Sequence, residues 1–306
     1  MKEFSENQKC AVIVVTYNGK KEWYNKCFQS LLSSSIPLEI IAVDNKSTDD
    51  SVSYINDNFP KIKVIQNNEN FGFAKANNIG INFALNNGND YFFLLNQDAW
   101  VEKNTIETLI LTAENNAEFG ILSPIHLTAD KNSFDKGFRN SFKNCSETAD
   151  AYENLYLNKQ PILYQTREIA AAAWLITRKC IEIVGGFDTI MFKHYGEDNN
   201  YCQRVLFHKF KIGIVPSATI CHDREFRVNK PFDQNIIFAI IWSDILSTKK
   251  MYFKRIIVNF FKILLFKSVK GGFKEMFFVV KNFKKILQSR KNNKQKGKGL
   301  VYLKGI

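Results

Sequence analysis

Short apolar runs alternate with helix-like segments over the first 125 residues. The apolar, often β-branched runs are residues 11–16, 38–43, 61–65 and 91–95. Helical spacing of apolar positions marks the segments between and after them, at residues 22–32, 49–58, 73–86 and 103–116. This alternation predicts β-α-β units and an α/β fold with a mostly parallel central sheet. Because the strands are nearly continuous in apolar residues, we expect helices on both faces of the sheet.

The pattern changes after residue 125. Residues 126–167 are polar and weakly periodic, and we expect a flexible or acceptor-side insertion there. Order returns at residues 168–176, followed by a predicted helix at 197–207 and a strand at 211–215. From residue 233 onward the pattern is helical. The sequence therefore predicts a catalytic-type domain over residues 1–232 and a helical extension over residues 233–306.

Composition and charge distinguish these two regions. Of the 306 residues, 45% are hydrophobic and 24% charged, which excludes a disordered or collagen-like chain. The formal charge is +12, yet residues 249–306 contain 17 Lys and Arg and one acid, so the preceding part is slightly acidic. A basic segment of this kind favours an anionic partner, either a membrane or a nucleic acid. We do not expect nucleic acid, because no recognised binding module accompanies the charge.

The cysteines and the apolar runs indicate the cellular compartment in which the protein works. The six cysteines form no C-x-x-C pair, which is typical of buried thiols in a reducing compartment. The N-terminus lacks the apolar core of a signal peptide, and no run approaches about 18 uninterrupted apolar residues. We therefore expect a cytoplasmic protein that touches a membrane peripherally, at its inner face.

Polar clusters follow each of the first four predicted strands, and parallel strand ends of this type form ligand sites. No G-x-G-x-x-G follows the first strand and no G-x-x-x-x-G-K-[ST] occurs. The sequence therefore lacks the motifs of a dinucleotide-binding fold and of a P-loop. The candidate ligand-binding residues in these clusters are Thr16, Tyr17, Asn18, Asp44, Asn45, Asn70, Gly72, Lys75, Asn77, Asn96, Gln97 and Asp98.

The clusters resemble, in order, the motifs of the inverting GT-A glycosyltransferases of family 2, especially the rhamnosyltransferase-like branch. That family reads roughly V-T-Y-N, V-D-N-x-S-x-D, N-x-G-F-A-x-x-N-N-x-G, L-N-x-D, G-G-F-D and E-D. The matching positions here are 15–18, 43–49, 70–80, 95–98, 185–188 and 197–198. The resemblance implies a GT-A fold and transfer of a sugar from a dTDP- or UDP-linked donor to a glycan or lipid-linked acceptor. Its branch implies rhamnose, and its setting implies cell-surface polysaccharide synthesis.

The resemblance also implies roles on the donor side. Asp44 corresponds to the family aspartate that accepts a hydrogen bond from a pyrimidine N3–H, although a turn or cap residue would also fit. Asn70, Lys75 and Asn77 lie where a helix N-terminus favours an anion, and Lys75 would add a charge-assisted contact to the diphosphate. For Lys75, a solvated helix face is the alternative.

Asp98 occupies the last position of the family's metal-binding D-x-D motif, so the resemblance implies Mn²⁺ or Mg²⁺, which prefer carboxylate oxygen. Asn96 replaces the first acid of that motif. His222 corresponds to a histidine that completes the metal shell in related galactofuranosyl- and rhamnosyltransferases. The alternative for His222 is a loop histidine bonded to Asp223 or to backbone.

The resemblance identifies Asp198 as the general base that takes the acceptor proton, with Glu197 orienting the acceptor. Acidic charge at a helix N-terminus is the alternative for both residues. Asn200 stands where the family often has an aspartate. Trp174 would offer the acceptor an apolar platform, unless it belongs to a core strand.

The C-terminal extension contains an amphipathic pattern. Phe273, Met276, Phe277, Val280, Phe283 and Leu287 recur at helical spacing. Lysines lie beside them, at positions 270, 274, 281 and 285. Such a helix lies on anionic membranes. The alternative is a helix pair that packs on the catalytic domain with a solvated basic face.

Two other functions remain open at this point. A sugar nucleotidyltransferase would need a Gly-rich, basic loop after the first strand, and residues 16–19 match that poorly. An inactive sugar-nucleotide-binding or membrane scaffold protein is the second. Asp98 and Asp198 argue against it, whereas Asn96 and Asn200 keep it open.

Overall fold

The order of strands and helices follows the predicted alternation closely over the first half of the chain. The computed structural model describes residues 8–143, 161–224, 233–246, 270–297 and 299–304, with a few positions within 153–159 and 254–261. The strands are β1 Cys10–Thr16, β2 Glu39–Asp44, β3 Lys63–Gln66, β4 Tyr91–Asn96, β5 Ala99–Val101, β6 Phe119–Thr128, β7 Tyr164–Thr166, β8 Ala173–Thr177 and β9 Lys211–His222. The helices are α1 Lys21–Leu32, α2 Ser51–Asn58, α3 Gly72–Asn86, α4 Thr105–Asn115, α5 Lys136–Lys143, α7 Arg178–Val184, α8 Glu197–Phe207, α9 Gln234–Ser243 and α11 Lys270–Asn293.

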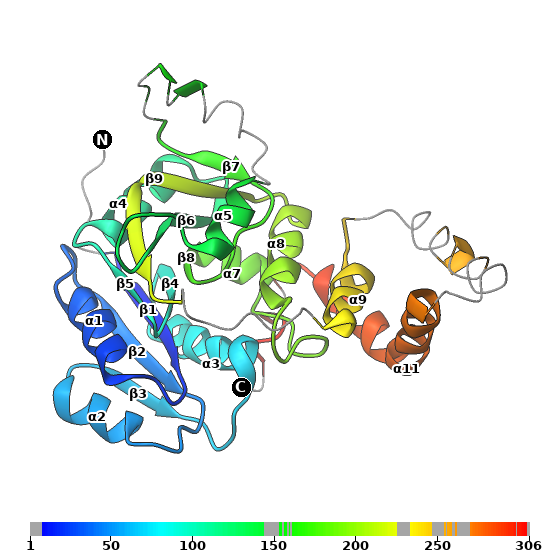
Figure 1. Ribbon diagram of the computed structural model, residues 1–306, viewed down its shortest axis with the longest axis horizontal. Coiled ribbons are helices and arrows are strands. Elements are labelled where there is room, and N and C mark those ends of the chain that lie inside the picture. The colour runs from blue at the N-terminus through cyan, green and yellow to red at the C-terminus, as the bar shows by residue number, and fades with distance from the viewer. Residues whose placement is uncertain are drawn as a thin grey trace.

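Within the described residues the strands form one nine-stranded sheet in the order β3-β2-β1-β4-β8-β6-β9-β5, and β7 pairs with β9 (Figure 1). Strands β3, β2, β1 and β4 are parallel neighbours, as predicted. Strand β8 runs antiparallel to both β4 and β6, and β5 and β7 run antiparallel to β9. The expected mostly parallel sheet is therefore correct for its first half, and the complete sheet is mixed.

Helices cover both faces of this sheet, as the continuous apolar strands predicted. Along β1, Ala11 and Ile13 face a core shared with α3, α7 and α8. The alternate residues Val12 and Val14 face a second core shared with α1, α2 and α4. Burial on both faces explains why the strand lacks a polar side. The layers hold the carboxyl ends of β1, β2 and β4 at one edge of the sheet.

The segment 126–167 is more structured than its sequence pattern predicts. Strand β6 continues to Thr128, α5 follows, and Tyr164–Thr166 adds β7 to the sheet. Phe138 is fully buried and Asp135 is 3% exposed. These residues are ordered by partners from β9 and other distant parts of the chain, whereas an acceptor-side role for the insertion stays a prediction. Residues 144–152 of the predicted insertion lie outside the described residues.

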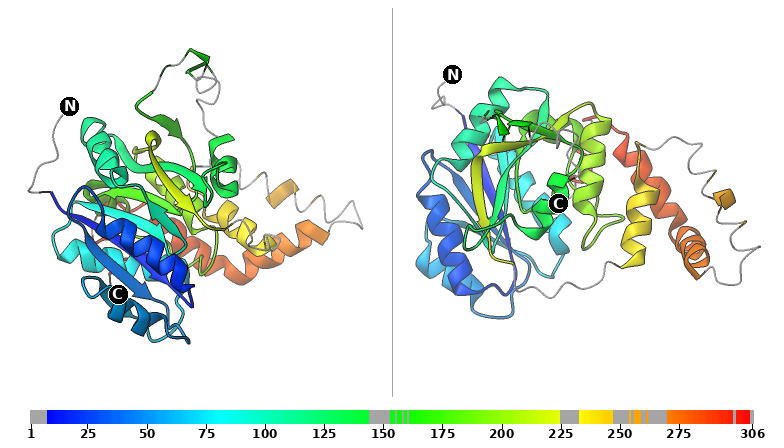
Figure 2. Two further views of the ribbon diagram at one scale, coloured as in Figure 1. Left: turned by 60° about the vertical axis from the view of Figure 1, so that its left-hand side comes forward. Right: turned by 45° about the horizontal axis from the view of Figure 1, so that its top comes forward.

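The described residues after 232 pack on one another and on the preceding part of the chain. Phe238 of α9 contacts Phe278 of α11, and the Trp242 indole donates a 2.8 Å hydrogen bond to Glu275. Figures 1 and 2 show α9 and α11 side by side, with α9 next to α8. The chain then returns, and the Gly186 amide donates to the Val301 carbonyl at 2.8 Å. Among the described residues, no helix has the length and apolarity needed to cross a bilayer.

The cysteines that the structure describes are buried thiols, as predicted. Cys10, Cys27, Cys180, Cys202 and Cys221 are free and buried. Burial raises the pKa of the Cys10 and Cys27 thiols, so they stay protonated. Cys145 lies outside the described residues.

Candidate active site

The first two polar loops meet at a buried carboxylate. Strands β1 and β2 are parallel and pair Thr16 with Asp44. Thr16 Oγ1 donates to Asp44 Oδ1 at 3.3 Å, and the Ser47 amide and hydroxyl donate to the same carboxylate at 2.9 and 2.5 Å. Three donors hold Asp44, which is 2% exposed, in one orientation. A carboxylate offers about four acceptor positions, so one is left for a ligand N–H.

Asn18 ties the same two loops together. Its amide N–H donates to Ser47 Oγ at 3.0 Å, and its side-chain oxygen accepts from the Thr48 amide at 2.8 Å. Asn18 has φ of 44°, a left-handed conformation that asparagine tolerates better than most residues. This residue therefore fixes the loop shape, whatever further contact it makes with a donor.

The third loop is held by its asparagines. Asn45 Nδ2 donates to the Gly72 carbonyl at 3.1 Å, and Asn70 Oδ1 accepts from the Gly72 amide at 3.0 Å. Asn77 is 1% exposed and donates to the Phe73 carbonyl at 3.0 Å. These amides are used to shape the loop, so burial argues against direct ligand contacts by Asn45 and Asn77. Lys75 Nζ lies 3.5 Å from the centre of the Phe71 ring, a cation–π contact.

Gly72 allows a second loop to approach closely. Its φ is +78°, and a Cβ at this position would lie 2.1 Å from the Lys193 carbonyl oxygen. No side chain fits in that space. The expected donor-binding glycine thus brings the third loop against the segment that leads to Asp198.

Gln97 joins the fourth loop to the first. Its Oε1 accepts a 2.9 Å hydrogen bond from the Tyr17 amide, and its Nε2 donates to the Tyr17 carbonyl at 3.3 Å. The Tyr17 ring is 43% exposed. The backbone of Tyr17 is fixed while its side chain stays open to solvent at the rim of the site.

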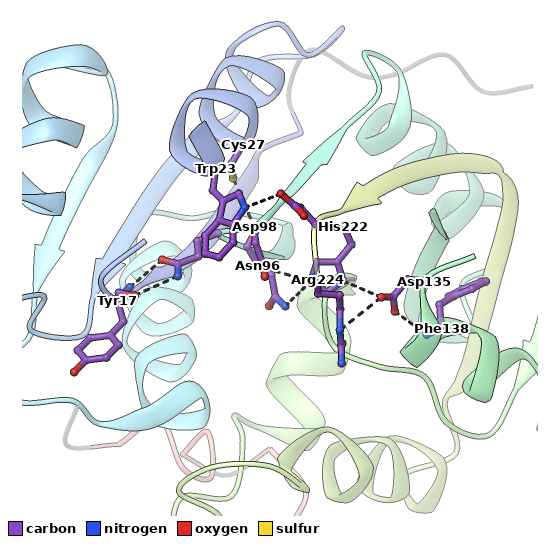
Figure 3. Close-up of polar contacts among 11 residues, drawn as sticks. Tyr17, Trp23, Cys27, Asn96, Asp98, Asp135, Phe138, His222 and Arg224 are labelled. Atoms are coloured by element: carbon purple, nitrogen blue, oxygen red, sulfur yellow. Dashed lines mark hydrogen bonds and ion pairs between the residues drawn. The ribbon is translucent and has the colours of Figure 1, made fainter. Parts of the chain in front are cut away.

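Asp98 and His222 come together as the resemblance implies. Ala99 of β5 pairs with His222, the last residue of β9. Asp98 Oδ1 lies 3.2 Å from His222 Nε2, and Asn96 Nδ2 lies 3.4 Å from the same nitrogen (Figure 3). The side chains of Asp98 and His222 are 1% and 0% exposed. The alternative partner, Asp223, instead accepts a hydrogen bond from the Trp23 indole at 2.9 Å.

A second carboxylate lies behind His222, and sequence reasoning missed it. Asp135 Oδ2 is 3.7 Å from His222 Nδ1 and 3.6 Å from Arg224 Nε. His126 is buried nearby, and burial together with His222 lowers the pKa of His126 to about 3. His126 is therefore neutral at physiological pH. No local signal marks Asp135, since it lies in the segment that the pattern predicted to be an insertion.

The Asp98 and His222 pair fits a divalent cation. One carboxylate oxygen and one imidazole nitrogen converge in a buried place, a donor set that suits Mn²⁺. Within the described part of the chain, no group of three or more His, Cys, Asp or Glu side chains is placed to hold a metal ion. The protein would thus supply two ligands, leaving the other positions to substrate oxygens and water.

Backbone hydrogen bonds link the proposed base, Asp198, to the segment that carries Asp98. The Asn96 amide donates to the Ala172 carbonyl at 3.0 Å, and the neighbouring Ala171 amide donates to the Asp198 carboxylate. The Asn199 amide donates a further bond to Asp198 Oδ1 at 2.8 Å. The residues between β7 and β8 therefore connect the metal-type site with the first turn of α8.

Two adjacent acids begin α8. Glu197 is 6% exposed, and its burial and the charge of Asp198 raise the pKa of Glu197 to about 8. Burial is also the main cause that raises the pKa of Asp198, with the charge of Glu168 adding to it. A basic carboxylate at this place is suited to accept a proton from an acceptor hydroxyl.

Helix α9 supports this turn. Gly196 has φ of +87°, and a Cβ there would lie within 3.1 Å of the Phe192, Ile236 and Ile240 side chains. Asn200 is fully buried and donates to Ser243 Oγ of α9 at 3.3 Å. Asn200 therefore holds the extension rather than an acceptor, which accounts for the amide where the family often has an aspartate.

Trp174 is not an acceptor platform. It is fully buried in β8, and its ring lies 6.1 Å from the Phe187 ring and 6.0 Å from the Tyr201 ring. Strand β8 is interior to the sheet and covered by helices, so no face of the indole is open to a sugar. The core-strand alternative is correct.

A pocket of about 270 Å³ opens along α8 beside the base. Asn199 and Glu168 are bonded at 3.2 Å across its edge, and Asp198 directly precedes Asn199. It is lined by two leucines and five polar or charged residues, which expose mainly apolar surface to it: Arg167, Glu168, Asn199, Gln203, Leu206, Asp244 and Leu246.

Two comparisons of the sequence with known proteins bear on its family. The sequence model described as "Glycosyl transferase family 2" matches residues 11–178, more than half of the chain. The chain is 23% identical over 218 residues to the dTDP-rhamnosyl transferase RfbF of Shigella flexneri, covering 71% of this chain and 69% of that protein.

Two solved structures share the fold. The crystal structure of S. aureus TarS 1-349 in complex with UDP has a TM-score of 0.55 and 16% identity, covering 93% of this chain and 82% of that one. The structure of GalNAc-T7 with UDP, GalNAc and Mn²⁺ has a TM-score of 0.61 and 17% identity, covering 93% of this chain and 57% of that one. At these identities the likeness shows the fold.

Proposed function

The chain belongs to glycosyl transferase family 2, and from this premise we propose a specific reaction. The protein transfers a sugar from a nucleoside diphosphate sugar to a hydroxyl of a glycan or lipid-linked acceptor, with inversion at the anomeric carbon. The observation that carries the proposal is the short path from Asp98 and His222, through Asn96 and Ala172, to Asp198. This path supports the proposal of a cation-type site for the diphosphate that is linked to a buried base for the acceptor.

On the donor side, Asp44 accepts the N3–H of a pyrimidine base through its remaining acceptor position. Asp98 and His222 would hold Mn²⁺ or Mg²⁺ against the diphosphate. When bound, this cation supplies positive charge that stabilises the leaving diphosphate. The structure of GalNAc-T7, whose title names UDP and Mn²⁺ together, supports this proposal.

On the acceptor side, the Asp198 carboxylate takes the proton from the acceptor hydroxyl as its oxygen attacks the anomeric carbon. The new glycosidic bond forms on the face opposite the breaking bond to the diphosphate. One base is enough for this single displacement, and its product has inverted configuration. The pocket lined by Asn199 and Gln203 receives the acceptor, and Glu197 orients the acceptor beside Asp198.

We propose rhamnose, carried by dTDP, as the first choice of donor. The branch-specific resemblance of the motifs supports this choice. So does the similarity to a dTDP-rhamnosyl transferase over 71% of the chain. We also propose that the protein is cytoplasmic and works at the inner face of the membrane, where the basic segment 249–306 meets anionic lipids.

A thermal-shift screen tests the donor site. UDP, dTDP, GDP and CMP are each added with and without Mn²⁺ to the wild type, Asp98→Ala and the exposed control Asp57→Ala. We expect a Mn²⁺-dependent shift with one pyrimidine diphosphate, kept in the control and lost in Asp98→Ala. Saturation at 100 times Kd adds about 2.7 kcal/mol of stability. If a folded wild type responds to no nucleotide, the donor site is wrongly assigned. Binding without release of nucleoside diphosphate from dTDP-rhamnose would favour the scaffold alternative.

A further inference from the structure

Helix α11 has apolar side chains on two opposite faces. Its inner face packs on α9 through Phe278, Val279 and Ile286, together with Phe238 and Trp242. The outer face is open to solvent. Its five apolar side chains, which we call the α11 stripe, are all more than half exposed: Phe273 66%, Phe277 65%, Val280 73%, Phe283 55% and Leu287 53%. Their spacing places them along one side of the helix.

All charged side chains on the open side of α11 are basic. Lys274, Lys281, Lys284 and Lys285 are exposed around the α11 stripe. The one acid of the helix, Glu275, is 4% exposed and faces inward, where it accepts the hydrogen bond from Trp242. The outer surface of the helix thus combines phenyl and aliphatic groups with lysines and carries no negative charge.

We propose that the α11 stripe is the surface that binds an anionic lipid bilayer. Helix α11 lies in the plane of the membrane, its aromatic and aliphatic side chains enter the boundary between headgroups and acyl chains, and the lysines contact lipid phosphates. Charge complementarity favours this occupant over a second copy of the chain, because two copies would bring their lysines together. The inference rests on the proposed membrane location and names the surface responsible.

The contacts of α11 also fix how the enzyme sits on the membrane. Ser289 is hydrogen-bonded to the buried Asp188, and Arg290 Nη1 donates to the Asp244 carbonyl at 2.6 Å. Helix α9, which α11 covers, touches Gly196 beside the base. A bilayer on the α11 stripe therefore lies at the α9–α11 end of the molecule (Figures 1 and 2). The pocket beside Asp198 is lined by Asp244 and Leu246 from that same end, which suits an acceptor anchored in lipid.

Vesicle co-sedimentation of the full chain tests the inference. The vesicles are pure phosphatidylcholine, or phosphatidylcholine with 30% phosphatidylglycerol, at low and high salt. The variants are Phe277→Ser with Val280→Ser, and Lys281→Gln with Lys285→Gln. The matched control is Ile162→Ser, which removes a side chain that is 71% exposed elsewhere. We expect salt-sensitive binding to the anionic vesicles only, reduced at least tenfold by the stripe variant and roughly fivefold per lysine by the charge variant. The control binds like the wild type.

Each other outcome overturns the inference in a recognisable way. If the wild-type protein does not bind anionic vesicles, both the α11 stripe as a lipid-binding surface and the membrane location are refuted. Binding that survives in the stripe variant leaves the membrane location standing and refutes the surface. A wild-type dimer that the stripe variant dissociates, measured by light scattering, makes the stripe an interface between copies. The nucleotide thermal shift of every sample shows that the variants are folded, and it tests the proposed reaction separately.

Discussion

Asp98 Oδ1 lies 3.2 Å from His222 Nε2, although 124 positions separate the two residues. The pairing of Ala99 with His222 at the end of β9 creates this proximity. Both side chains are buried and so are held apart from bulk water. In the protein interior the attraction of the pair for a cation is stronger than it would be in water. The site thus depends on a short antiparallel strand pair.

Removing the charge of Asp135 should weaken metal binding without touching a proposed ligand. Asp135 faces His222 Nδ1 at 3.7 Å, the position of an outer carboxylate that orients a metal-binding imidazole. We expect Asp135→Asn to lower Mn²⁺ affinity by roughly tenfold or more. The affinity is measured by titrating the protein with Mn²⁺ in the presence of dTDP and recording the electron paramagnetic resonance signal. The exposed variant Asp130→Asn serves as control, and equal affinities in all three proteins would show that Asp135 has no such role.

Replacing the base should separate chemistry from donor binding. Asp198→Asn keeps the shape of the side chain but cannot accept the acceptor proton. We expect kcat to fall by about 10²–10⁴ while the nucleotide thermal shift stays unchanged. Release of dTDP from the donor and acceptor measures the rate. Activity within tenfold of the wild type would assign the base elsewhere.

Stability should depend on pH through Glu197. Its pKa is raised from the usual 4.5 to about 8 in the folded state, so between these values the folded chain holds a proton that the unfolded chain releases. Stability therefore falls as pH rises through this window. Glu197→Gln removes this dependence. We therefore expect the Tm of the variant, relative to that of the wild type, to be higher at pH 8 than at pH 5. Differential scanning fluorimetry across pH 5–8.5 checks this, and parallel curves would contradict it.

The glycine that begins the Gly-Gly-Phe-Asp motif should be intolerant of a side chain because of the returning C-terminal segment. At Gly185 φ is +84°, and a Cβ would lie 2.2 Å from the Val301 carbonyl oxygen. Gly88 has a similar φ of +81° with nothing within 4 Å, so Gly88→Ala reports backbone strain alone. That strain costs about 1–3 kcal/mol, and we expect Gly185→Ala to cost clearly more in urea unfolding. Equal losses in both variants would mean that the Val301 contact is easily displaced.

Sequence alone predicted the parts of this protein that depend on local pattern. The apolar runs located β1, β2 and β4, because each strand is buried on both faces by the helices beside it. The polar residues at their ends, such as Asp44 and Asn96, could then be assigned to one edge, since parallel strands end together. The resemblance further implied that Asp98 and His222 belong to one metal site and that Asp198 is the general base.

Only the tertiary structure decided which partner covers each side chain. Trp174 follows a run of alanines whose pattern fits a core strand or an exposed platform, and the packing of Phe187 and Tyr201 made it core. Asp135 joined the site because β6 and β9 bring its segment to His222. In α11 the periodicity shows apolar residues but cannot tell which face packs on α9. Local spacing determines which residues share a face, whereas contacts between distant segments determine whether that face meets protein, ligand or solvent.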